Sequence, residues 1–126
     1  MRHYRVTLAD ALSAHFDALS TGGGRDGAVN EHLLQSALAR PYSGYYKPIA
    51  CKAAALLHAV VKNHAFTDGN KRTAFLLMEL LIRRSGYSLV LREGDLIDDM
   101  VVAVADDTMP LDDLVTWLRQ RLVKSG

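Results

Sequence analysis

The chain has 126 residues, of which 49% are hydrophobic and 23% are charged, and its formal net charge is +1. This length suits a single domain over residues 1–126, and the composition excludes intrinsic disorder, a collagen-like repeat and, with one cysteine, a disulfide framework. The near-neutral charge argues against direct nucleic-acid binding. No apolar run approaches the roughly 20 residues that span a bilayer, and the first residues do not resemble a signal peptide. We therefore expect no membrane association and a cytoplasmic location.

Helical periodicity predicts three helices in the first half of the chain. Thr7 is a candidate N-cap for the first helix, which ends at a run of three glycines. Asn30 is placed to cap a second helix, which Pro41 stops. Pro48 suits the first turn of a third helix that runs to about His64.

The second half of the chain predicts three more helices. One runs from about residue 69 to 85, and because residues 74–82 are apolar on nearly all sides, we expect it at the centre of the domain. Residues 87–91 alternate weakly and predict one short strand or extended segment. Amphipathic helices are expected at 95–106 and 110–123. The prediction is an all-α, six-helix bundle around a central buried helix, with at most one short β element.

The sequence HAFTDGNKR, which starts at His64 and ends at Arg72, joins the third and fourth helices. Unpaired N–H groups and the positive end of a helix dipole make a helix start a phosphate site. Gly69 lets a ligand approach the backbone, and Lys71 adds positive charge beside Arg72. Asp68 is placed to hold Mg²⁺, and an imidazole such as His64 can take a proton from a hydroxyl near neutral pH. Base, metal ligand and anion site together predict phosphoryl or nucleotidyl transfer.

Each of these residues also has a purely structural interpretation. Asp68 could be only an N-cap, and His64 a histidine favoured at a helix C-terminus. Asn70 could form a local turn. Lys71 and Arg72 could be a solvated first turn, although cations are unfavourable at a helix start, which favours a compensating anion.

The same nine residues resemble the signature of the Fic/Doc family, H-x-F-x-(D/E)-(G/A)-N-(G/K)-R. Further segments, at residues 34–41, 52–58 and 114–119, look like those of the Doc (death-on-curing) toxins of toxin–antitoxin modules. The resemblance implies a helical fold around this loop and the transfer of part of a nucleotide to a protein hydroxyl.

Two positions depart from the pattern of Fic adenylyltransferases. Lys71 stands where those enzymes have glycine, and Phe75 stands where they have a second arginine. Doc toxins carry the lysine, and the resemblance implies that they bind ATP reversed and transfer its γ-phosphoryl group to a threonine of elongation factor Tu. The resemblance therefore implies a toxin-type protein kinase that blocks translation. The alternatives are a protein adenylyl or nucleotidyl transferase and a catalytically silent partner-binding module.

The resemblance also implies a role for each residue of the loop. His64 would be the general base, Asp68 would hold Mg²⁺, and Phe66 would be structural. The residues that would hold the triphosphate of ATP, with the amides of the helix start, are Gly69, Asn70, Lys71 and Arg72.

The sequence also bears on how the activity would be regulated. Many Fic proteins restrain themselves through (S/T)-x-x-x-E, but no serine or threonine stands four residues before any of the three glutamates here. The resemblance then implies a Phd-type antitoxin whose C-terminal segment folds into a groove between helices. Tyr42, Tyr45 and Tyr46 form either a flap over a target segment or ordinary loop aromatics. No carboxylate or cysteine stands at metal-site spacing from four other histidines, which are interpreted as surface or core residues: His3, His15, His32 and His58.

Overall fold

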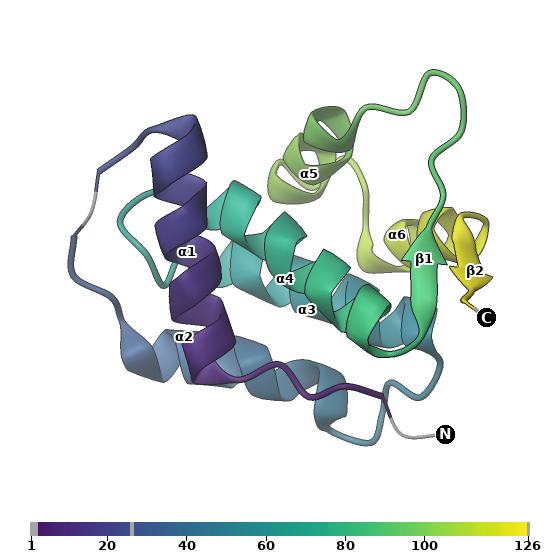
Figure 1. The fold of residues 1–126 in the computed structure, drawn as a ribbon, viewed down its shortest axis with the longest axis horizontal. Coiled ribbons are helices and arrows are strands. Elements are labelled where there is room, and N and C mark those ends of the chain that lie inside the picture. The colour runs from purple at the N-terminus through teal and green to yellow at the C-terminus, as the bar shows by residue number, and fades with distance from the viewer. Residues whose placement is uncertain (1–2, 26, 126) are drawn as a thin grey trace.

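The computed structural model describes residues 3–25 and 27–125, and the chain in these ranges is mostly helical (Figure 1). The described helices are α1 (Leu8–Gly22), α2 (Glu31–Ala39), α3 (Ile49–Asn63), α4 (Asn70–Arg84), α5 (Ile97–Ala105) and α6 (Leu111–Arg119), with a 3₁₀ turn, η1, at Arg40–Tyr42. Two short strands, β1 (Tyr87–Leu89) and β2 (Leu122–Lys124), form one small sheet. The predicted all-α, six-helix class is confirmed. None of the described helices has the length and apolarity to cross a membrane.

Local capping chemistry sets the predicted helix starts. The Thr7 hydroxyl accepts the Asp10 N–H at 3.1 Å, while the Asp10 carboxylate accepts the Thr7 N–H at 2.9 Å, which is a complete capping box. The Asn30 side chain accepts the Leu33 N–H at 3.0 Å. Pro48 lies just outside α3, as an extended N-cap, rather than in its first turn.

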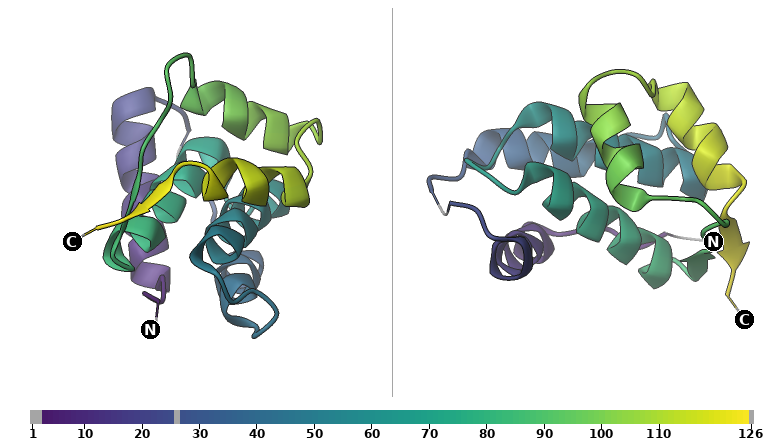
Figure 2. Two further views of the ribbon diagram at one scale, coloured as in Figure 1. Left: turned by 90° about the vertical axis from the view of Figure 1, so that its right-hand side faces the viewer. Right: turned by 90° about the horizontal axis from the view of Figure 1, so that it is seen from above.

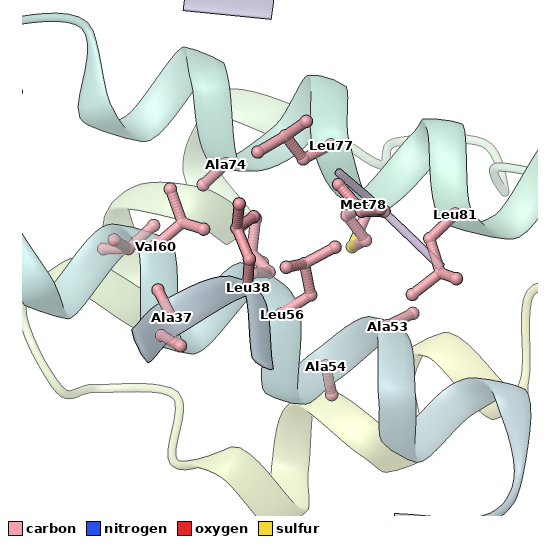
Figure 3. Close-up of a cluster of buried hydrophobic side chains, with 14 of the residues drawn as sticks. Ala37, Leu38, Ala53, Ala54, Leu56, Val60, Ala74, Leu77, Met78 and Leu81 are labelled. Carbon is pink, nitrogen blue, oxygen red and sulfur yellow. The ribbon is translucent and has the colours of Figure 1, made fainter. Parts of the chain in front are cut away.

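The core lies between α3 and α4, whose buried faces meet along most of their length (Figure 3). Seen from above, α4 lies between α1 and α3 (Figure 2, right), while α2 and α6 pack on other sides of α3. Met78 and Leu81 of α4 and Leu56 of α3 are fully buried in this layer. The centre is thus shared by two helices, and α3 is buried over more of its surface than α4.

The C-terminal helix ends earlier than predicted, at Arg119, so the prediction of helix to residue 123 is wrong. β2 pairs antiparallel with β1, with Ser88 opposite Val123. The Arg121 guanidinium lies 4.2 Å from the Trp117 ring centroid and donates to the Asp95 carboxylate at 2.6 and 2.9 Å. The bonds to Asp95 and the pairing with β1 are contacts with segments far away in the sequence, and they outweigh the local helical periodicity.

The tyrosine loop lies at the opposite end of α3 from His64. With its fifteen residues, α3 puts roughly 22 Å between the two ends. The Tyr42 hydroxyl donates to the Tyr4 carbonyl and accepts the Val6 N–H, each at 2.8 Å, so it ties the N-terminal segment to the fold. Tyr45 is exposed and packs edge-on against Tyr46. None of the three tyrosines therefore lines either of the two pockets that contain His64, and the flap stays a prediction.

Candidate active site

The loop between α3 and α4 and the first turn of α4 line one pocket of about 340 Å³. Its other walls are Val61, Thr67 and Ala105. All the predicted site residues lie around this pocket: His64, Asp68, Gly69, Asn70, Lys71 and Arg72. The structure thus brings together the residues that the sequence predicts as a site, while their chemical roles remain predictions.

His64 ends α3 in a left-handed backbone conformation, with φ 50° and ψ 48°. This conformation is uncommon for a residue with a side chain, and histidine adopts it more readily than most. The imidazole is exposed, and no hydrogen-bond partner for it is found among residues 3–25 and 27–125. It also lines a second pocket, of about 530 Å³, whose opposite wall is the segment 28–31. The ring therefore stands where the two pockets meet.

The start of α4 has the properties of an anion site. Gly69 is the N-cap, with φ 77°, and no side chain caps the helix. The Asp68 carboxylate accepts the N–H of Gly69 at 2.8 Å instead, so Asp68 is not the N-cap. Uncapped N–H groups and the helix dipole thus coincide at the pocket.

Asp68 is charged and accessible. The N–H groups of Gly69 and Arg25, which donate to its two oxygens at 2.8 and 3.2 Å, hold the pKa of the Asp68 carboxyl below its usual range. A carboxylate has lone pairs for further partners, so these bonds leave room for a cation. The described residues contain no cluster of three metal-ligating side chains. One carboxylate beside an anion site fits Mg²⁺, which takes one or two protein carboxylates together with waters and substrate phosphates.

The two cations of the first turn differ in their surroundings. The Arg72 guanidinium donates from Nη1 to the Ala18 carbonyl at 3.0 Å, near the C-terminal end of α1. No basic residue of α1 itself lies in its last turn, so Arg72 supplies the cation that this negative helix end favours. That contact offsets the unfavourable interaction of the Arg72 cation with the positive end of the α4 dipole. Lys71 is exposed and has no ion pair within the described ranges.

Asn70 braces the loop. Its side-chain oxygen accepts the Phe66 N–H at 3.1 Å, and its side-chain nitrogen donates to the Phe66 carbonyl at 2.9 Å. Phe66 is buried, as the sequence predicts for a core aromatic. The local-turn interpretation of Asn70 thus describes its contacts well, and one N–H of its amide remains for a ligand.

His15 is a site-supporting residue that sequence reasoning missed. It is buried in α1, and its ring stacks on Phe66 with centroids 3.9 Å apart and planes 10° from parallel. Its Nε2 lies 2.9 Å from the Asp68 carbonyl, which can only accept, so Nε2 carries the proton. Its spacing from Ala11, Ala14 and Ala18 predicts a buried face, but no local pattern reveals the contact with a loop 53 residues away.

Comparisons with known proteins agree with this geometry. A model of the Fic/DOC family matches residues 5–82. The chain is also 34% identical over 112 residues, which cover 81% of it and 86% of the relative, to the toxin Doc of Mycolicibacterium smegmatis (strain ATCC 700084 / mc(2)155). The chain belongs to the Fic/DOC family. Membership of this family implies an enzyme of the transferase type.

Proposed function

We propose that this chain is a toxin that acts as a protein kinase, transferring the γ-phosphoryl group of ATP to a hydroxyl of a translation factor. The observation that carries the proposal is the convergence of His64, Asp68 and the uncapped, cationic start of α4 on one pocket. The similarity to a protein named toxin Doc supports the toxin class. Elongation factor Tu, through a threonine, is the acceptor that the resemblance to Doc toxins implies, and the proposal requires a cytoplasmic location.

The proposed reaction assigns one task to each group. His64 takes the proton of the acceptor hydroxyl as its oxygen forms a bond to the γ-phosphorus. The bond from that phosphorus to the β–γ bridging oxygen breaks, ADP leaves, and the proton passes from His64 to solvent. The α4 amides, Lys71 and Arg72 stabilise the charge on the phosphate oxygens. Mg²⁺ held by Asp68 would neutralise part of that charge.

The meeting of two pockets at His64 supports a protein acceptor. The pocket that contains the cations suits the triphosphate, and the pocket along residues 28–31 is open to a segment of a second protein. A base between the two can serve both substrates, because general-base catalysis needs the base within hydrogen-bond reach of the proton it removes.

The surroundings of Phe75 support phosphoryl over adenylyl transfer. Phe75 lines a groove together with Ile97 and Val101 of α5, so the position of the family's second arginine contributes no charge here. Lys71 adds a long cation at the position where adenylyl-transferring relatives have glycine. These two differences favour a different seating of the triphosphate.

The test uses ATP carrying the label on either the α- or the γ-phosphorus, with purified elongation factor Tu and Mg²⁺. The proposal predicts γ-label in the factor and a mass gain of one phosphate on a threonine. The α-label in the factor, with the mass gain of a nucleotide, would establish nucleotidyl transfer instead. ATP binding without transfer to any translation factor would favour the silent binding module. His64→Ala should abolish transfer while its circular dichroism spectrum stays that of the wild type.

We also propose that an antitoxin of the Phd type restrains the chain, because no inhibitory (S/T)-x-x-x-E segment is found in the sequence. Its segment would enter the groove of about 300 Å³ between α4 and α5, which shares Lys71 and Arg72 with the phosphate pocket. An occupant of the groove would therefore lie against the same cations that the reaction needs.

Co-expression with the neighbouring gene product tests this regulation. Growth should fail when the chain is expressed alone and recover with the partner. Val102→Asp places a charge at the groove and should weaken rescue, whereas Val123→Asp, at a similarly exposed valine of β2, should not. Harmless expression of the wild-type chain alone would count against the toxin proposal.

A further inference from the structure

The last turn of α1 contains a glycine that its backbone does not require. Gly22 is the last residue of α1, and it is absent from the described glycines with positive φ. Alanine would be the better residue in such a position, because glycine has the greater backbone entropy to lose in a helix. The backbone of α1 therefore does not explain the glycine, whereas packing against Arg72 does.

The space that a side chain of Gly22 would fill contains the guanidinium of Arg72. A Cβ built on Gly22 overlaps the central carbon and both terminal nitrogens of that group. The guanidinium is seated there by its bond to the Ala18 carbonyl, four residues earlier in the same helix. Arg72 has five N–H donors in a planar fork, so this one bond leaves donors free for a ligand.

Gly24, two residues further along, is constrained by its backbone as well as by packing. A Cβ on Gly24 would lie 3.0 Å from the Asp68 carboxylate, but Gly24 also has φ 122°, which disfavours any side chain. A substitution at Gly24 would thus disturb both backbone and site. At Gly22, by contrast, the backbone imposes no such constraint, and the constraint comes from packing against Arg72.

We infer that Gly22 is a positioning residue for this site, because its missing side chain leaves the slot in which the guanidinium of Arg72, a residue that lines the phosphate pocket, lies against α1. The inference rests on the proposed function in one respect, namely that the ligand of Arg72 is a polyphosphate. Gly22→Ala should move the guanidinium out of the slot while leaving α1 helical. A displacement of about 1 Å in a positioning group can cost on the order of 100-fold in rate.

Binding of Mg²⁺·ATP, measured by calorimetry, tests the positioning role without requiring transfer. Gly22→Ala should bind at least about tenfold more weakly than wild type, and its transfer rate should fall on the order of 100-fold. Ser20→Ala is the matched control, because Ser20 is exposed in the same turn and its hydroxyl bonds only to its own helix, at the Phe16 carbonyl. Equal binding by all three proteins would overturn the inference and leave the proposed function intact. Failure of the wild type to bind would overturn both, whereas binding without transfer would overturn the proposed kinase activity alone.

Thermal unfolding tests the slot itself. Gly22→Ala should raise the melting temperature in an Arg72→Ala background, since the overlapping group is gone and alanine favours the helix. In the wild-type background the same change should lower the melting temperature or raise it less. An equal rise in both backgrounds would contradict the inferred contact, whatever the activity.

Discussion

Replacing His15 by alanine should loosen the loop between α3 and α4 and destabilise the whole domain. The change removes a stacked ring pair with Phe66, worth about 0.5–1.5 kcal/mol beyond burial, and a hydrogen bond to the Asp68 carbonyl, worth about 0.5–1.5 kcal/mol. The expected loss in the free energy of unfolding is therefore about 1–3 kcal/mol. For a domain of this size, that is a fall of roughly 4–12 °C in melting temperature.

Urea unfolding, followed by circular dichroism, measures this loss. A second substitution separates the contribution of the hydrogen bond from that of the ring stacking. His15→Phe keeps a ring against Phe66 and removes only the hydrogen bond, so it should cost about 0.5–1.5 kcal/mol. His32→Ala, at an exposed histidine of α2, is the control and should change stability by less than about 0.5 kcal/mol. If His15→Ala were as stable as this control, the account of His15 as the support beneath the loop would be refuted.

Asn70→Ala should cost about 1–3 kcal/mol in urea unfolding, because both hydrogen bonds to the Phe66 backbone are lost. Asn70→Asp should cost less, since one oxygen still accepts the Phe66 N–H and a negative charge suits a helix start; a less stable Asn70→Asp would contradict this. The lowered pKa of Asp68 gives a pH-dependent prediction. Its ionised form contributes stability above the ordinary aspartate pKa, and that contribution is lost as the pH falls through the lowered value. Asp68→Asn lacks this contribution, so its melting temperature should fall less steeply than that of the wild type below about pH 4. Parallel pH profiles of the two proteins would contradict it.

Sequence reasoning predicted what local chemistry determines. Thr7 and Asn30 cap helices because a short side-chain oxygen satisfies N–H groups two or three residues ahead, and such a pattern is visible in a few residues. The site residues from His64 to Arg72 also converge through local structure, because they belong to one short loop and the helix turn that follows it.

Contacts between distant segments were not predictable in this way. β2 forms because β1 lies beside it, and α6 stops where Arg121 turns toward Asp95, 26 residues earlier. The support from His15 and the seat of Arg72 on α1 are likewise tertiary contacts, made across 53 and 54 residues. The helical spacing of apolar residues predicts which face of a helix is buried, but it does not show which segment packs on that face.

The central claim is that a polyphosphate binds at the start of α4 beside the His64 ring. Titration of the ¹⁵N-labelled protein with Mg²⁺·ATP, followed by NMR, tests it directly. The amides of residues 69–72 and the His64 ring signals should shift together and saturate with one affinity, while Tyr45, at the far end of α3, stays unchanged. Saturable shifts confined to other parts of the fold, or none at millimolar ATP, would contradict the claim.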